Sequence, residues 1–354
     1  MMIASVIGAN ALGYAFHLIT GRLLGPADYG QFGLILSFYM LMSLPFSGFY
    51  WAVLRYTSTN KTETTSDIRL ILLRLTRIGF ILSIVFALIL ILGKYFWEEY
   101  VNISDPFEML ILALTFFGAI MSSLIRGRIH GRRQYKTISW LTVFEGVVRV
   151  SMVVTILYFW ENIFGAFIAF CCGYIVPALP YSKEFFKDLR EGIREERQSK
   201  EKIQFSWKYM LLISLKNTVL LGIIELSVLV ANQLLEPQEL GYWNAAITLG
   251  RINIFTANGI ISVLFSESTN TSDKSDALVL LKKASKFYLA ITLLVAALFF
   301  IVPSWFVLPL YGKSFIGATE YLPWIGLGTG FFGLIQILTG YYFSRLSISS
   351  STNK

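Results

Sequence analysis

Five ionisable residues interrupt long apolar runs of the chain: Glu145, Arg149, Lys216, Glu225 and Arg251. A charge in such surroundings is costly unless it faces a polar cavity or a partner of opposite sign, so each is a candidate functional residue. The guanidinium group of arginine suits an anionic ligand, because it can hold phosphate oxygens through two parallel donors. Arg251 lies near the middle of its apolar run and is the strongest candidate for such a cation.

The spacing of these residues limits how they act together. Glu145 and Arg149 are four positions apart and share one helix face, which fits either an ion pair within the helix or a role in a cavity. Lys216 and Glu225 are nine positions apart and point to opposite faces at about 100° per residue. Either carboxylate could bind a proton or a cation. Arg55 ends an apolar run, where a cation either reaches back to lipid phosphates or guards the mouth of a cavity.

Motifs for other kinds of chemistry are absent from the sequence. Cys171 and Cys172 are adjacent in an apolar run, which gives neither a disulfide framework nor the spacing of a metal site. The sequence has no phosphate-binding glycine loop and no nucleophile with a plausible base. We therefore expect no cofactor, no bound metal and no enzymatic activity.

The composition identifies the solvent that surrounds these residues. Of the 354 residues, 55% are hydrophobic and only 15% are charged, with a mean hydropathy of +0.62. Soluble domains carry about 25% charged residues, so lipid must cover much of this surface. The net charge of +8 does not indicate nucleic-acid binding, because the basic residues form short clusters between apolar runs instead of one basic face.

The apolar runs predict an all-α membrane protein with about ten transmembrane helices, since each crossing needs about 20 apolar residues. The predicted spans cover residues 3–19, 30–53, 78–96, 107–125, 138–159, 163–181, 207–235, 240–265, 287–308 and 321–343.

Basic residues orient these spans. Of the 30 lysines and arginines, 24 follow the second, fourth, sixth, eighth and tenth spans. Because basic loops stay in the cytoplasm, both termini are expected on the cytoplasmic side of the cell membrane. The first apolar run lacks a basic segment before it, so we expect no cleavable signal peptide.

An internal repeat divides the chain into two halves. The octamer LLGPADYG at residues 23–30 recurs as LLEPQELG at residues 234–241, and each copy joins one apolar span to the next. In both copies a proline followed by an acidic residue starts a helix, and the last glycine permits close helix packing. Both copies lie on the same predicted side of the membrane, which indicates two parallel repeats of the kind found in many transporters.

The repeat and the charge pattern predict four segments. These are an N-terminal six-helix lobe at 1–182, a cytoplasmic linker helix at 183–204, a C-terminal four-helix lobe at 205–346 and a disordered tail at 347–354. Within the linker, Lys187 and Glu191 have the i,i+4 spacing of a helical ion pair, as do Glu196 and Lys200. We expect this helix to lie along the membrane surface, with a lipid head-group or partner role as the alternative.

Three motifs resemble one family of transporters. They are RLLGPADYGQF at residues 22–32, LGYWNAA at residues 240–246, and LYGKSF at residues 310–315 followed by Ala318. They resemble the Wzx-type oligosaccharide flippases, the polysaccharide biosynthesis membrane proteins of the multidrug/oligosaccharidyl-lipid/polysaccharide exporter superfamily. The resemblance covers nearly the whole chain and is specific for the family but not for the substrate.

The resemblance implies a MATE-like fold of two six-helix bundles around a cavity that opens alternately to either side. It implies that polyprenyl-diphosphate-linked oligosaccharide moves from the cytoplasmic to the outer leaflet, with membrane lipids and polysaccharide-assembly proteins as partners. The second lobe has four predicted spans instead of six, so we expect a truncated or a shortened variant. For such a cargo, Arg251, Arg149, Lys216 and Arg55 would bind the diphosphate, and Glu145 or Glu225 would bind a coupling ion.

Three alternatives compete with this interpretation. A cation-coupled multidrug or small-molecule exporter of the same fold would need a cavity dominated by carboxylates. A membrane glycosyltransferase or ligase would need external loops that carry catalytic groups, whereas three residues, 160–162, join the fifth and sixth spans. A non-transporting interaction protein would fit the shortened second lobe.

Overall fold

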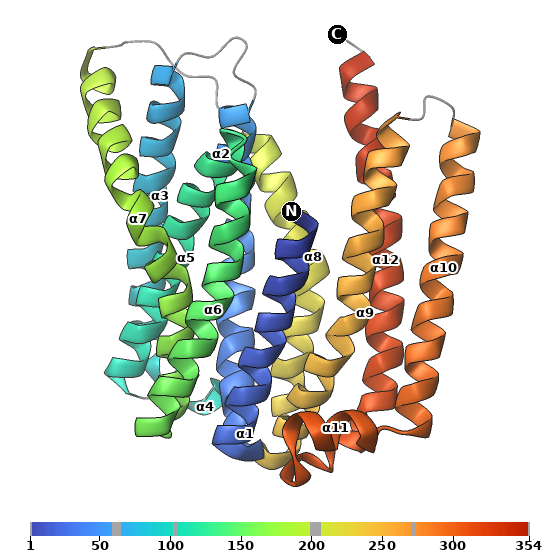
Figure 1. Ribbon diagram of the computed structural model, residues 1–354. Coiled ribbons are helices and arrows are strands. Elements are labelled where there is room, and N and C mark those ends of the chain that lie inside the picture. The colour runs from blue at the N-terminus through green and yellow to red at the C-terminus, as the bar shows by residue number, and fades with distance from the viewer. Residues whose placement is uncertain are drawn as a thin grey trace. The chain divides into compact units, whose positions relative to one another are not determined.

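The computed structural model describes residues 2–58, 65–101, 103, 105–198, 207–270 and 274–352, and the regular structure of these residues is entirely helical. The α-helices and two short 3-10 helices follow one another along the chain (Figure 1) as α1 (Met2–Ser43), η1 (Leu44–Phe46), α2 (Gly48–Ser58), α3 (Thr65–Leu92), α4 (Lys94–Val101), α5 (Pro106–Gly131), α6 (Tyr135–Phe159), α7 (Ile163–Gln198), α8 (Trp207–Asn232), α9 (Pro237–Asn270), α10 (Lys274–Ile301), α11 (Ser304–Tyr311), η2 (Lys313–Phe315) and α12 (Ala318–Thr352).

Eight stretches of the described residues are long and apolar enough to cross a membrane. The first covers 55 residues, Ala4–Ser58, and overlaps both of the first two predicted spans. The other seven lie in α3, α5, α6, α7, α8, α10 and α12, each over one predicted span. The remaining predicted span, 240–265, lies in α9, which is a continuous helix of 34 residues but is not one of the eight apolar stretches.

Several helix ends differ from the sequence-based boundaries. The span predicted at 78–96 is divided into α3 and α4 at Gly93, and the one at 287–308 into α10 and α11 before Pro303. Helix α7 continues through the predicted linker to Gln198, so residues 183–198 extend the sixth span without a break. Helix α12 continues to Thr352, where a disordered tail was expected. Lys200 lies outside the described residues.

A sharp break divides α1 at the first copy of the repeat. Gly25 has a φ of 77° and a ψ of 174°, and Pro26 follows it. A positive φ is accessible to glycine at little cost, and proline is tolerated at the first position of the next helical segment. The two predicted spans on either side of this break are therefore separate helical segments within α1.

The helices pack as two compact units. The first unit comprises Met1–Leu24 and Gln31–Leu234, and the second comprises Gly25–Gly30 and Leu235–Lys354. Helix α8 packs in the first unit against η1 and α2, whereas the sequence-based division assigns it to the C-terminal lobe at 205–346. The division into lobes stays a prediction, and the packing adds that the chain passes between the units at both copies of the repeat.

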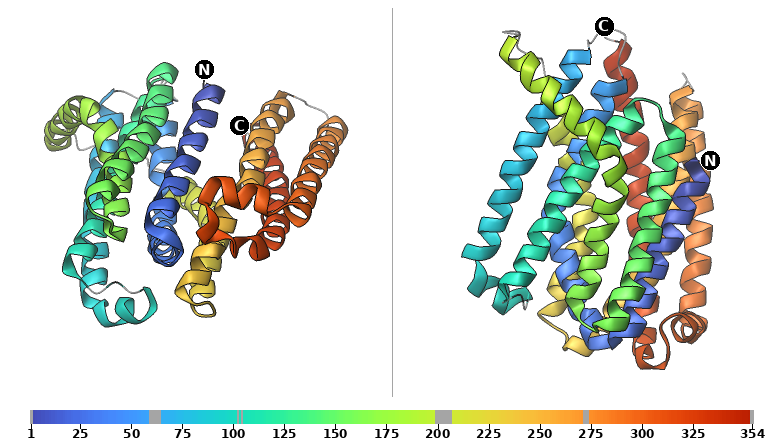
Figure 2. Two further views of the ribbon diagram at one scale, coloured as in Figure 1. Left: turned by 60° about the horizontal axis from the view of Figure 1, so that its bottom comes forward. Right: turned by 60° about the vertical axis from the view of Figure 1, so that its left-hand side comes forward.

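The first unit has an aromatic core between η1, α3 and α5. The ring of Phe116 on α5 stacks on that of Phe86 on α3, with 4.4 Å between centroids, and packs edge-on to Phe46. Helix α6 lies beside the N-terminal part of α1 (Figure 2), where a Cβ atom on Gly146 would lie 2.7 Å from the Cβ of Leu12. Small residues at such contacts let helices approach closely in lipid.

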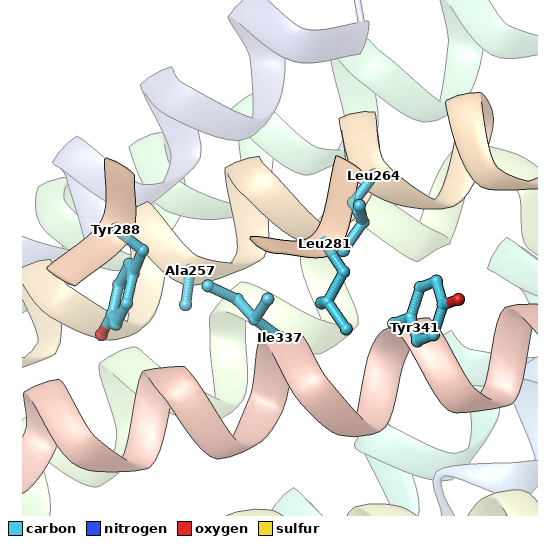
Figure 3. Packing of buried hydrophobic residues seen from close by; sticks show 6 residues of the cluster. All are labelled: Ala257, Leu264, Leu281, Tyr288, Ile337 and Tyr341. Atoms are coloured by element: carbon cyan, nitrogen blue, oxygen red, sulfur yellow. The ribbon is translucent and has the colours of Figure 1, made fainter. Parts of the chain in front are cut away.

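The second unit is built from α9, α10 and α12. Figure 3 shows six buried side chains of these helices in one cluster, in which Tyr288 of α10 and Ile337 of α12 are fully buried. The hydroxyl group of Tyr288 donates to the backbone oxygen of Gly330 at 3.0 Å, so its polar atom is satisfied inside an apolar core.

The two copies of the repeat meet inside the second unit. A Cβ atom on Gly30 would lie 2.6 Å from the backbone oxygen of Pro237, and a Cβ atom on Gly241 would collide with the backbone oxygen of Pro26. The contact is reciprocal, because each copy's glycine packs on the proline of the other, as in a two-fold interface. The sequence repeat is thus also a structural repeat at these residues.

Candidate functional site

Glu145 joins two arginines in the first unit. Its Oε1 atom lies 2.5 Å from Nη2 of Arg149, and its Oε2 atom lies 2.5 Å from Nη2 of Arg126. The three side chains are 14%, 18% and 20% exposed, respectively. One carboxylate thus balances only one of the two guanidinium charges, and the cluster carries a net charge of +1.

Two features of the local structure bring these groups together. Glu145 and Arg149 are one helical turn apart on α6, so their contact follows from helix geometry. Arg126 comes from α5, which ends at Gly131, and Arg133 in the turn before α6 has a φ of 57°. This turn reverses the chain and places the last turns of α5 against α6. The guanidinium of Arg126 also donates to the backbone oxygen of Leu141 at 3.3 Å.

Helix α7 provides an aromatic seat for Arg149. The Cζ atom of Arg149 lies 4.3 Å from the ring centroid of Phe170 and 4.6 Å from that of Tyr174. Both distances are within the range of cation–π interactions. Gly173 lies between the two aromatic residues in sequence and leaves the space that the Arg149 side chain fills. The arrangement holds the guanidinium in one position beside Glu145.

A Gly173→Ala substitution tests this seat. The added Cβ would collide with Cγ of Arg149 and would lie 2.5 Å from its Nε and 2.9 Å from its Cδ, so the arginine side chain must leave its position beside Phe170 and Tyr174. We expect a loss of thermal stability of about 1–3 kcal/mol, because the added methyl group overfills the contact and displaces the guanidinium from both rings. Gly13→Ala on α1 is the control, because its Cβ would meet nothing within 4 Å. Equal thermal stability of the two variants would mean that the space beside Gly173 does not hold the Arg149 side chain in place.

A pocket of about 250 Å³ adjoins this cluster. The hydroxyl group of Tyr50 on α2 and Nδ1 of His130 on α5 lie 2.5 Å apart at its wall, and Arg126 lines it as well. The remaining lining residues come from α1, α5 and α6: Ser5, Val6, Ser123, Ile138, Ser139 and Thr142. The pocket therefore presents hydroxyl groups, an imidazole and a guanidinium, which together suit an anion or water.

The other predicted site residues lie elsewhere. Arg55 is exposed near the end of α2, and Lys216 and Glu225 are half-buried on α8. Arg251 is half-buried on α9 in the second unit. The sequence-based prediction missed Arg126. Its only signal is its place directly after the apolar run predicted as the span 107–125.

A second charged cluster surrounds Asp188 on α7. Its carboxylate lies 2.5 Å from Nε of Arg128, 3.5 Å from Nη2 of Arg132 and 3.8 Å from Nε of Arg69. The Arg128 and Asp188 side chains are only 5% and 9% exposed. Arg69 also contacts Glu191 at 2.5 Å, so the network joins α3, α5 and α7. Because all its members are paired, we assign it a structural role.

Neither cluster has the composition of a metal site. In the described ranges of the chain, no group of three or more His, Cys, Asp or Glu side chains is arranged to hold a metal ion. The cluster at Glu145 contains one carboxylate and two cations, and such a set of groups favours an anionic ligand over a cation.

Comparisons with known proteins give one family and one fold. The sequence model of the polysaccharide biosynthesis protein family (Polysacc_synt) matches residues 1–266, and no curated protein sequence matches the chain. The lipid II flippase MurJ in an inward closed conformation has a TM-score of 0.69 and 14% identity over 97% of this chain and 75% of that one.

Two further structures are those of MATE transporters. An outward-facing multidrug resistance MATE family transporter of the MOP superfamily has a TM-score of 0.57 and 13% identity, over 97% of this chain and 83% of that one. A MATE protein in a bent conformation has a TM-score of 0.56 and 11% identity, over 99% and 94%. At such low identities the likeness establishes the fold alone, which is the all-helical fold shared by MurJ and the MATE proteins.

Proposed function

The chain belongs to the polysaccharide biosynthesis protein family, and from this membership we propose that it is a transporter of a lipid-linked saccharide. It is a multi-pass membrane protein with a MATE/MurJ-like fold. The proposed cargo is an oligosaccharide linked to polyprenyl diphosphate, moved from the cytoplasmic to the outer leaflet. In this proposal both termini face the cytoplasm, and the flipped lipid passes to proteins that assemble polysaccharide.

The observation that carries the proposal, beside the family, is the cationic cluster at Glu145. A diphosphate head group cannot enter an apolar bundle without compensation for its charge. The cluster has two guanidinium groups for one carboxylate, and hydroxyl groups and an imidazole are among the groups that line its pocket. Arg149 is held in place by Phe170 and Tyr174, so it would not need to be ordered when the anion arrives.

Each predicted residue has a role in this proposal. Arg149, Arg251, Lys216 and Arg55 contribute positive charge to the path of the diphosphate. Glu145 and Glu225 are the candidates for a coupling proton or cation. Protonation of Glu145 would release Arg126 and Arg149 from their shared partner and raise the positive charge of the cluster. Binding of a proton and of an anion at this cluster would therefore favour each other.

An Arg251→Ala variant tests the role of the half-buried cation on α9. We expect the rate of transport to fall on the order of tenfold or more, because a charge-assisted hydrogen bond contributes about 1.5–3 kcal/mol. Arg251→Lys should restore part of the rate, since it keeps the charge but loses the two-donor geometry. Lys286→Ala, an exposed cation on α10, is the control. A wild-type rate in a normally inserted Arg251→Ala variant would remove Arg251 from the mechanism.

Leaflet-resolved analysis of lipid-linked oligosaccharides tests the function itself. Cells that lack the protein should retain glycosylated polyprenyl diphosphate on the cytoplasmic face, and expression of the chain should clear it. An unchanged distribution of these lipids in the two kinds of cell would contradict the proposal.

A cation-coupled multidrug exporter of the same fold is the second candidate. The fold likeness to MATE proteins and the presence of Glu145 beside this pocket support it. A cationic drug would need a negative site, however, and Glu145 is outnumbered by the two arginines that it contacts. In the leaflet experiment this candidate predicts greater sensitivity to cationic drugs without any change in the lipids.

A further inference from the structure

The last four turns of α7 carry a stripe of basic side chains. Lys183, Lys187, Arg190, Arg194 and Arg197 are all exposed, and all are spaced by three or four residues. At 100° per residue, these five positions fall within about 80° of the helix circumference. The stripe is therefore one narrow face of the helix, instead of a general excess of positive charge.

The acidic residues of the same segment lie on its other faces and are neutralised within the bundle. Asp188, Glu191 and Glu195 pair with Arg69 on α3, and Asp188 also pairs with Arg128 on α5. By contrast, acidic side chains neutralise little of the positive charge of the basic stripe. Lys187 lies 4.0 Å from Glu191, and the other four stripe residues have no ion-pair partner among the residues that the structure describes.

An apolar groove of about 450 Å³ adjoins the start of the stripe, and Leu179 and Phe186 at its edge lie next to the stripe on the helix circumference. It is formed by α3, α5 and α7, and its residues include Phe80, Met121, Leu179 and Phe186. Phe80, Leu179 and Phe186 are 53%, 57% and 60% exposed, which in a membrane protein means that they face lipid. The α7 part of the groove ends at residues 182–186, where the stripe begins.

The length of α7 places this junction at the membrane surface. Its 36 residues would extend for about 54 Å at 1.5 Å per residue, whereas a hydrocarbon core is about 30 Å thick. A span that begins at Ile163 leaves the hydrocarbon after about 20 residues, close to Lys183. The groove then lies at the depth of acyl chains, and the stripe lies at the depth of phosphates.

We propose that this junction is a binding site for one anionic phospholipid, with an acyl chain in the groove and the phosphate on the stripe. The groove favours a lipid over an acidic protein as the ligand. An acidic protein bound at the stripe would not account for the apolar groove at the depth of the acyl chains. The site belongs to the leaflet at which α7 ends and is separate from the cluster at Glu145.

Native mass spectrometry of the purified full-length chain tests the proposal. It would compare the binding of phosphatidylglycerol and phosphatidylcholine that carry identical acyl chains. The variant K183Q/R190Q/R194Q should weaken phosphatidylglycerol binding on the order of 100-fold at low ionic strength, because each surface cation contributes about a factor of five. Ala178→Phe, which fills the groove, should weaken the binding of both lipids.

Matched controls separate the site from general effects. K282Q/K283Q/K286Q removes three exposed cations from α10, and Leu211→Phe adds a ring to an exposed position on α8. Both should leave lipid binding unchanged. Photoreactive phosphatidylglycerol should label Met121 or Leu179 of the wild type, which tests the groove even if Ala178→Phe does not fold.

Three results would overturn the proposal: equal binding of the two lipids by the wild type, unchanged binding by the stripe variant, or photolabelling outside the groove. Loss of binding to an acidic protein in the stripe variant, with lipid binding intact, would assign the stripe to a protein partner instead. None of these results depends on whether the chain transports lipid-linked saccharide.

Discussion

Asp188→Asn is expected to lower the stability of the folded protein by about 3–5 kcal/mol, the usual cost of removing one partner from a buried ion pair. The substituted amide would keep the size of the side chain but lose the charge that faces three arginines. The loss of this charge would affect Arg128 most, because its side chain is only 5% exposed and its Nε lies 2.5 Å from the carboxylate. Few other groups could replace the carboxylate as the partner of this guanidinium. Thermal unfolding of the purified protein in detergent would measure the loss.

Glu184→Gln is the matched control for this experiment. Glu184 also contacts Arg128, at 3.3 Å, but its side chain is 67% exposed. Solvent screens such a pair, and we expect a cost of about 1 kcal/mol or less. Similar unfolding temperatures for the two variants would mean that the network does not hold α3, α5 and α7 together.

Local spacing made one half of the candidate site predictable. Glu145 and Arg149 contact each other because residues four apart meet on any helix, whatever surrounds it. Arg126 could not be found in this way. Its contact with Glu145 depends on how tightly the chain turns after α5, and on which face of α5 then meets α6. The aromatic seat on α7 depends on a third helix in the same manner.

The same distinction applies to the fold. Hydropathy predicts the spans because each must match the thickness of a bilayer, and the span predicted at 240–265 lies in one continuous helix, α9. Hydropathy does not predict the continuation of α7 to Gln198. That extension is stabilised by acidic residues that pair with arginines of α3 and α5, and such partners are far apart in the sequence.

Gly241→Ala should be among the most damaging single-methyl additions in the chain, because the repeat copies meet through backbone atoms. The new Cβ would collide with the backbone oxygen of Pro26 and would lie 2.6 Å from its carbonyl carbon and 2.9 Å from its Cα. Backbone atoms cannot rotate away as a side-chain end can, so we expect a loss of about 3 kcal/mol. Gly241→Val should prevent recovery of folded protein after extraction in detergent.

Gly259→Ala on the same helix is the control, since its Cβ would meet nothing within 4 Å and alanine favours a helix by about 0.5–1 kcal/mol. Gly30→Ala should resemble Gly241→Ala, because its Cβ would lie 2.6 Å from the backbone oxygen of Pro237. The two glycines share one contact, so their double variant should cost less than the sum of the single variants. Additive costs would instead mean that each glycine is required by its own helix, and that the two repeats do not depend on each other at this point.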